Sequence, residues 1–175
     1  MIVALLASLS LAVTPARQCK VKREPGIPCA YSIVSRESGI PARILYAIAL
    51  QESRIALGNG RRQPWPWTLN VAGTGYRYGS RKAAFGALQS LLARGERRVD
   101  VGLMQVHYRF HDARLGTAWT ALHPMHNLRV GAAVLQDCFT KHGDWSGAIG
   151  CYHSGTPWRA AAYRTGVNTH IASLK

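Results

Sequence analysis

The spacing of apolar residues predicts a chain built mainly of helices, and one of these helices carries a glutamate. In the stretch 41–54, Ile44, Ile48 and Glu52 follow one another at intervals of four, and Leu45 falls on the same side. Residues at these intervals share one face of a helix. The carboxyl group of Glu52 therefore lies on the stripe that the aliphatic side chains would bury.

Burial would raise the pKa of the Glu52 carboxyl group, because a low-polarity environment disfavours its charged form. A carboxyl group with a raised pKa is what a general acid needs near neutral pH. The alternative is that Glu52, close to the helix end, turns its carboxylate to water, as most glutamates do.

Four further helices are expected, each marked by apolar spacing or by a capping residue. They cover residues 29–38, 80–93 with Ser80 as N-cap, 127–140 and 146–154. The stretch 61–80 is instead rich in Trp, Tyr, Gly and Pro, which predicts a β-hairpin or extended lobe. The fold class is therefore a single helical domain with a small β-hairpin or extended lobe.

The aromatic residues and arginines of the lobe between Trp65 and Tyr78 leave three interpretations open. They could form a local mini-core, a platform for sugar rings, or a nucleic-acid surface with stacking and basic groups. The mini-core is the default, since aromatic side chains usually pack.

The first 13 residues form an apolar run without a charged side chain, and small residues follow up to Ala16. The run is too short to span a bilayer and predicts a signal peptide over residues 1–16, although no basic residue precedes it. A buried N-terminal helix is the alternative. Residues 17–28 are charged and interrupted by two prolines, which predicts a loosely attached leader ahead of one domain at 29–175. We therefore expect export to the periplasm.

The charge balance is strongly basic, with 22 Lys and Arg against 8 Asp and Glu and a formal net charge of +14. Such a field favours an anionic partner: nucleic acid, anionic lipid or an acidic cell-wall polymer. Hydrophobic residues make up 47% of the chain, a share that excludes an intrinsically disordered protein.

Four cysteines allow three disulfide pairings, and export would favour disulfides over free thiols. Their spacing is not that of a zinc site, so no metal is expected. Cys138 lies about one turn before the bend at 142–144, and Cys151 lies under two turns after it. In two antiparallel helices these positions have similar heights, as a disulfide requires. We therefore expect Cys138–Cys151, which leaves Cys19–Cys29 as the weaker remainder.

Three segments follow one another in an order that is typical of one enzyme family: AIALQES at 47–53, DVGLMQV at 100–106 and AIGCYHSG at 148–155. Together they resemble the lytic transglycosylases with a goose-type lysozyme fold, over about residues 29–163. The resemblance implies an α+β, lysozyme-like fold. The stretch WPWTLNVAG at 65–73, with the closing GCYH, looks like a subgroup associated with integrative conjugative elements.

The resemblance implies that Glu52 is the catalytic acid and then the base, without a second carboxylate and without a cofactor. It assigns Asp100 no such role. Tyr152 should lie near Glu52, where its hydroxyl group could position the carboxyl group. Two histidines depart from the family pattern. The family usually has Asn at the position of His153, and Asn is also common at the position of His107. The substrate-binding residues that the resemblance implies are Ser53, Met104, Gln105, Tyr152 and His153. For Ser53 the resemblance leaves a second role open, which is to orient Glu52.

The sequence thus predicts a monomeric, exported lytic transglycosylase that acts on peptidoglycan glycan strands. The resemblance adds a role in opening the wall for a conjugation or type IV secretion apparatus. One alternative is a lysozyme-type hydrolase on the same fold. The other is a non-catalytic basic module that binds nucleic acid; nucleic-acid binding is not expected, because it would leave the three ordered segments unexplained.

Overall fold

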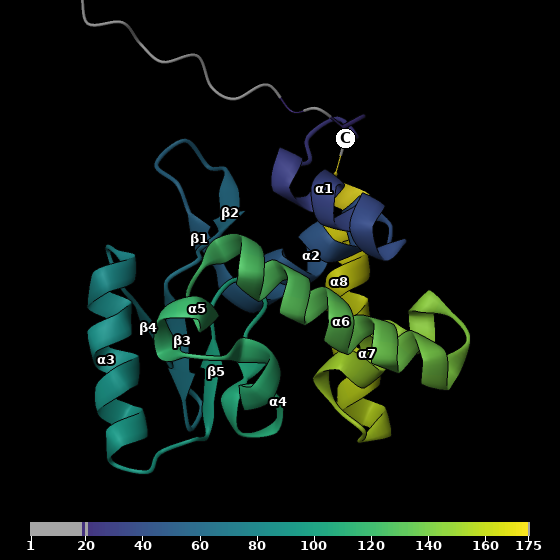
Figure 1. Ribbon diagram of the computed structural model, residues 1–175. Helices are drawn as coiled ribbons and strands as arrows, with labels where there is room; N and C mark the ends of the chain where they lie inside the picture. Colours follow the sequence, from purple (N-terminus) through teal and green to yellow (C-terminus); the bar gives the residue numbers. More distant parts are fainter. Residues whose placement is uncertain (1–18, 20, 175) are drawn as a thin grey trace, which may run out of the picture.

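The computed structural model describes residue 19 and residues 21–174, and in this part the chain is mainly helical with small β-sheets (Figure 1). This confirms the predicted fold class. The helices are α1 Cys29–Ser38, α2 Ala42–Ser53, α3 Arg81–Ala93, α4 Tyr108–Leu115, α5 Ala118–Ala121, α6 Pro124–His142, α7 Trp145–His153 and α8 Pro157–Ser173. The strands are β1 Arg54–Ala56, β2 Arg62–Pro64, β3 Thr68–Val71, β4 Thr74–Arg77, β5 Val99–Val101 and β6 Val106–His107.

Helix α2 lies at the centre, and nine of its 12 residues are buried. It is apolar on every side between Ile44 and Leu50, which is the pattern of a helix enclosed by its neighbours. It packs against α1 and α8, and Figure 1 shows these helices on one side of the molecule and the sheet with α3 on the other. Its last turn therefore leaves the core between the helices and the sheet.

Helix α2 ends at Ser53, one residue before the end of the predicted stretch 41–54, because the chain turns into strand β1 at Arg54. Arg54 has an extended backbone with φ −58° and ψ 143°. Strand β1 pairs with β2 in an antiparallel register that places Arg54 opposite Pro64 and Ala56 opposite Arg62. The pairing between these strands overrides the local helical preference.

The larger sheet has the strand order β4-β3-β5-β6. Its antiparallel register places Asn70 opposite Asp100, and Asp100 opposite His107. Side chains at directly paired positions point to the same face of a sheet. One row of three polar residues therefore crosses the sheet.

The predicted hairpin in the lobe is confirmed as β3 and β4. Trp65 and Trp67 pack edge to face with ring centroids 5.3 Å apart. The indole Nε1 of Trp65 donates a hydrogen bond to the carbonyl oxygen of Tyr78 at 2.8 Å. These contacts favour the mini-core among the three interpretations of the lobe.

The predicted start of α3 is confirmed, whereas α6 extends beyond the predicted 127–140 at both ends. Ser80 accepts a hydrogen bond from the backbone N–H of Ala83 at the start of α3. Gly143 ends α6 in the left-handed conformation, with φ 78°, and Asp144 caps α7. Helix α8 was not predicted.

The predicted signal peptide lies outside the described residues. The prediction of a loose leader is wrong for its described part, which is attached to the core. Ile27 is 2% exposed, Glu24 accepts a hydrogen bond from Arg43 at 2.9 Å, and Cys19 is joined to Cys29. Within residues 21–174, no helix has the length and apolar character needed to cross a membrane.

Both expected disulfides, Cys138–Cys151 and Cys19–Cys29, are present. The first joins α6 to α7 across the Gly143 turn and closes a sequence separation of 13 residues. Replacing Cys138 and Cys151 together by Ala should lower the free energy of unfolding by about 3 kcal/mol in the chain-entropy account. Urea unfolding of the variant and the wild type, followed by circular dichroism, measures the difference. Coinciding unfolding curves would contradict a stabilising role for this bond.

Candidate active site

Two cavities meet at Glu52. One has a volume of about 480 Å³ and opens towards the sheet; the other has a volume of about 380 Å³ and opens along α8. Glu52 and His153 line both cavities, so the cleft continues on either side of the carboxyl group. The first cavity is further lined by Asn70, Asp100, Gln105, Val106, His107, Phe110, His111, Val134 and Tyr152, and the second by Gln51, Trp158, Arg159, Ala162 and Tyr163.

Glu52 stands in the last turn of α2, and its carboxyl group is held by a single hydroxyl group. Tyr163 of α8 donates a hydrogen bond to Oε1 of Glu52 at 2.5 Å. Burial raises the pKa of Glu52 to about 7, the Tyr163 hydrogen bond opposes the rise, and the negative charge of Asp100 adds to it. Both protonation states of Glu52 are therefore populated near neutral pH.

The stacking of His153 on Tyr163 fixes the tyrosine ring beside Glu52. The two rings are parallel within 1°, with centroids 4.5 Å apart. Burial, and after it the charge of Arg159, lowers the pKa of His153 from its ordinary value of 6.5, so its ring is neutral at pH 7. A neutral imidazole adds no positive charge beside Glu52, which allows the pKa of Glu52 to stay high.

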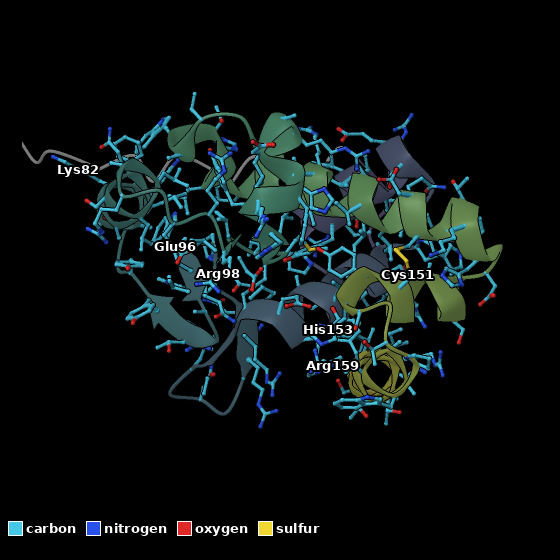
Figure 2. All side chains as sticks on the ribbon, turned by 90° about the horizontal axis from the view of Figure 1, so that it is seen from below. Lys82, Glu96, Arg98, Cys151, His153 and Arg159 are labelled. Atoms are coloured by element: carbon cyan, nitrogen blue, oxygen red, sulfur yellow. A yellow bond between two sulfur atoms is a disulfide. The ribbon has the colours of Figure 1, made fainter. Side chains whose placement is uncertain are left out.

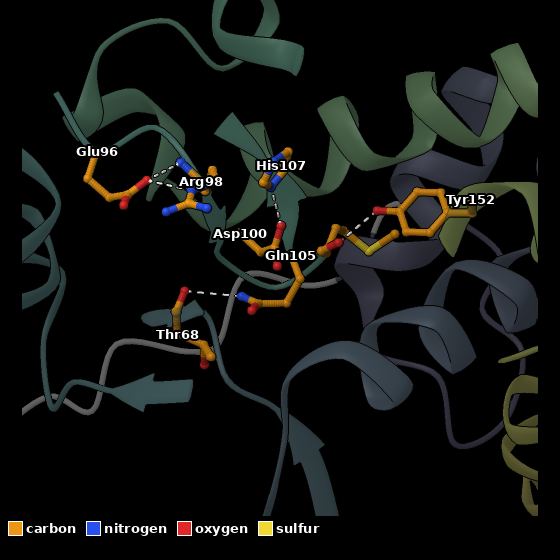
Figure 3. A network of polar contacts seen from close by, with 8 residues as sticks. Thr68, Glu96, Arg98, Asp100, Gln105, His107 and Tyr152 are labelled. Atoms are coloured by element: carbon orange, nitrogen blue, oxygen red, sulfur yellow. Dashed lines mark hydrogen bonds and ion pairs between the residues drawn. The ribbon is translucent and has the colours of Figure 1, made fainter. Parts of the chain in front are cut away.

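The row of polar residues on the sheet forms the wall of the first cavity. Nδ1 of His107 and Oδ1 of Asp100 are 2.7 Å apart, a contact visible in Figure 3. Asn70, opposite Asp100, has a buried Oδ1 atom without a hydrogen-bond partner among the described residues. The wall therefore presents a carboxylate–imidazole pair to the cavity, next to an unpaired amide oxygen that is itself buried.

The loop between β5 and β6 is held in a conformation that side-chain bonds stabilise. Gly102 has φ +81°, and a Cβ atom there would meet the side chain of Asn127 at 2.5 Å. Asn127 donates to the carbonyl oxygen of Val101 at 2.8 Å and accepts from the N–H of Met104 at 2.9 Å. Gln105, with φ 44°, donates to the carbonyl oxygen of Gly102 at 2.8 Å. The GLMQ segment thus positions the sheet wall against α2.

A family model described as "Transglycosylase SLT domain" matches residues 67–171, more than half of the chain. The chain belongs to this family. The match confirms the expected lysozyme-like fold, while the conjugative-element subgroup stays a prediction. Comparison with curated proteins and with solved structures gives no match.

The matched part of the SLT domain contains every residue that lines the two cavities except Gln51 and Glu52. These two come from α2, ahead of the matched range. Of the residues predicted for the site, Glu52, Gln105, Tyr152 and His153 line the cleft.

The prediction that Ser53 contacts the substrate is wrong, because Ser53 is fully buried. Its Oγ atom lies 2.8 Å from the carbonyl oxygen of Leu103 and 3.1 Å from that of Ala49. The hydroxyl group thus anchors the end of α2 to the GLMQ loop. Met104 is also fully buried, its side chain lies against Gly131, and it does not line the cleft as predicted.

The hydroxyl group that positions Glu52 belongs to Tyr163 and not, as expected, to Tyr152. Tyr152 lines the first cavity, but its hydroxyl group donates to the carbonyl oxygen of Met104 at 2.7 Å (Figure 3) and makes no hydrogen bond to Glu52. Tyr163 holds the carboxyl group instead, and it was missed because α8 was not recognised. The signal was available in the spacing of four between Tyr163, Val167 and Ile171.

Replacing Tyr163 by Phe should raise the pKa of Glu52, because the variant loses the hydrogen bond that lowers it. Replacing Asp100 by Asn should lower the pKa of Glu52, because the variant loses a negative charge that raises it. Carbon-13 NMR titration of the Glu52 carboxyl carbon measures both shifts against the wild type. Shifts of the same sign in the two variants would contradict this assignment.

Replacing Glu52 by Gln should stabilise the protein, and the gain should depend on pH. The pKa of Glu52 is about 7 in the folded protein against an ordinary value of 4.5. The folded state therefore binds this proton more tightly than the unfolded state, so stability is lost as the pH rises from 4.5 through 7. Gln avoids that loss, and we expect a gain of about 1–3 kcal/mol at pH 8. Urea unfolding at pH 4, 6 and 8 tests it; a gain independent of pH would contradict it.

Proposed function

We propose that the chain is a peptidoglycan lytic transglycosylase in which Glu52 acts first as acid and then as base. The family supports the reaction class. The observation that carries the proposal is the pKa of about 7 for a carboxyl group at the junction of the two cavities. A residue that donates and then accepts one proton works best when its pKa is close to the working pH.

In the first step, Glu52 protonates the oxygen of the MurNAc-(1,4)-GlcNAc bond, and the bond from that oxygen to C1 breaks. Tyr163 donates to Oε1, so the acidic proton resides on Oε2. Within residues 21–174, Oε2 makes no hydrogen bond and is available to the substrate. The N-acetyl group of the sugar stabilises the positive charge that forms at C1.

In the second step, the Glu52 carboxylate takes the proton of the C6 hydroxyl group while the C6 oxygen bonds to C1. The product is a 1,6-anhydro sugar, Glu52 regains its proton, and no water is consumed. Holding the C6 oxygen beside C1 makes the nucleophile intramolecular, which is a large kinetic advantage. One carboxyl group is sufficient for these two reaction steps.

Hydrolysis is the second candidate function, and the Asp100–His107 pair favours it. Glycoside hydrolases use two groups, one of which activates water or attacks the sugar. Asp100 and His107 line the same cavity as Glu52 and lie 2.7 Å apart, an arrangement able to take a proton from water. Hydrolysis would leave a reducing end in place of the anhydro ring.

We also propose that the protein works in the periplasm as a monomer, with one domain at 29–175 behind a signal peptide at 1–16. Two disulfides fit a protein outside the reducing cytoplasm, and the +14 charge suits an anionic wall. A role beside a conjugation or type IV secretion apparatus rests on the resemblance alone. Transfer frequency in a deletion strain complemented with the wild-type or Glu52→Gln gene tests that role.

Mass spectrometry of digested peptidoglycan tests the reaction. The wild type should release 1,6-anhydro-muropeptides, and Glu52→Gln should release them roughly 1,000-fold more slowly, since acid–base groups contribute 10²–10⁴-fold. Glu37→Gln is the matched control, because Glu37 of α1 is exposed and paired with Arg129 of α6. This variant should retain wild-type rates. Products one water heavier, which His107→Ala suppresses, would assign hydrolysis instead.

A further inference from the structure

The two sides of Glu52 differ in charge. The first cavity contains the carboxylate of Asp100 and is lined by no Arg or Lys. The second cavity contains the guanidinium group of Arg159, and Glu52 is its one acidic residue. A substrate that passes Glu52 therefore meets a negative group on one side and a positive group on the other.

The second cavity carries an exposed aromatic surface next to its positive charge. Trp158 is 68% exposed, and the guanidinium carbon of Arg159 lies 5.1 Å from the centroid of its ring. Within residues 21–174, Arg159 forms no ion pair. Figure 2 shows Arg159 beside His153 and far from Lys82, which lies at the opposite end of the molecule.

The positive charge continues from this cavity onto strands β1 and β2. Arg54 lies on the same face of β1 as Ala56, which is paired with Arg62, so the two arginines share one face. Both are exposed, and neither is paired with a carboxylate in the described part of the chain. Nη1 of Arg54 lies 3.5 Å from the carbonyl oxygen of Gln51, which lines the second cavity.

Helix α8 joins the cavity to these arginines. Trp158, Ala162, Gly166 and His170 follow at intervals of four and share one face of the helix, over about 18 Å. A Cβ atom at Gly166 would meet Oε1 of Gln51 at 2.8 Å, so this face lies against the end of α2. Burial, and after it the charges of Arg54 and Arg62, lowers the pKa of His170, consistent with its place at the far end.

We propose that the second cavity and its arginine edge, made by Arg159, Arg54 and Arg62 with Trp158, bind the carboxylate-bearing stem peptide of the glycan substrate. The inference rests on the proposed function. The sugar rings of the strand are neutral, so the anionic groups available to these arginines are the carboxylates of the peptide. Guanidinium groups bind carboxylates through paired hydrogen bonds. The ring of Trp158 would pack against the apolar part of the bound peptide.

The first cavity is the wrong place for such a peptide, because the Asp100 carboxylate would repel it. The arrangement therefore orients the strand: the MurNAc of the cleaved bond, with its peptide, lies on the α8 side of Glu52. The enzyme should then prefer strands whose stem peptides carry free carboxylates.

Binding to the Glu52→Gln protein tests the inference without turnover. Isothermal titration calorimetry compares a glycan fragment whose stem peptides keep their free carboxylates with the same fragment after those carboxylates are converted to amides. We expect at least 10-fold tighter binding of the fragment with free carboxylates. Adding Arg159→Gln, or Arg54→Gln with Arg62→Gln, should reduce that ratio to about one. Adding Lys82→Gln, an equal change of charge at the far end, should leave the ratio unchanged.

Equal affinity for the two fragments would overturn the inference. So would a preference that persists in both arginine variants, or tighter binding of a single-stranded DNA oligonucleotide through the same arginines. Release of anhydro-muropeptides by the wild type is measured separately. A failed inference thus leaves the proposed function standing, and a failed reaction leaves the binding result interpretable.

Discussion

The structure depends on one constraint: a carboxyl group is withdrawn from water at the end of a buried helix without a cation to neutralise it. Removing a charged group from water is very unfavourable unless it is paired. Here the partner of Glu52 is the hydroxyl group of Tyr163, and its charged neighbour is the acidic Asp100. The chain has 22 Lys and Arg residues, yet only Arg159 lines a cavity together with Glu52, and within residues 21–174 it forms no ion pair. The group responds by keeping its proton to about pH 7.

Several residues away from the substrate cleft hold Glu52 and Tyr163 in position. Ser53 anchors the end of α2 to the GLMQ loop, and Asn127 holds that loop from within the core. The Cys138–Cys151 bond ties α7 to α6 immediately before Tyr152. The His153 ring then lies flat on Tyr163. The position of the Tyr163 hydroxyl group beside Glu52 thus depends on four helices, α2, α6, α7 and α8, and on the GLMQ loop.

The sequence predicted what local patterns determine. The bounds of α1, the Ser80 cap, the β3–β4 hairpin and the Cys138–Cys151 pair follow from short-range spacing and turn chemistry. The apolar stripe around Glu52 likewise indicated a dry carboxyl group. These features depend on residues close together in the chain.

The remaining features depend on contacts between distant segments. The end of α2 at Ser53 is set by the pairing of β1 with β2. Asn70, Asp100 and His107 form one row only because strands β3, β5 and β6 pair in this register. Tyr163 is 111 residues from Glu52, so the apolar spacing of α8 could reveal the helix but not its contact with Glu52. The resemblance implied a substrate contact for Ser53, but its side chain is buried in the core.

The most direct test of this account compares two titrations of the wild-type protein. Carbon-13 NMR follows the Glu52 carboxyl group, and kcat/KM on glycan strands is measured over the same pH range. The account predicts that Glu52 titrates near pH 7 and that the rate falls at the same midpoint, as the acid loses its proton. A carboxyl group that titrates near its ordinary value of 4.5, or a rate that stays constant through pH 8, would contradict it.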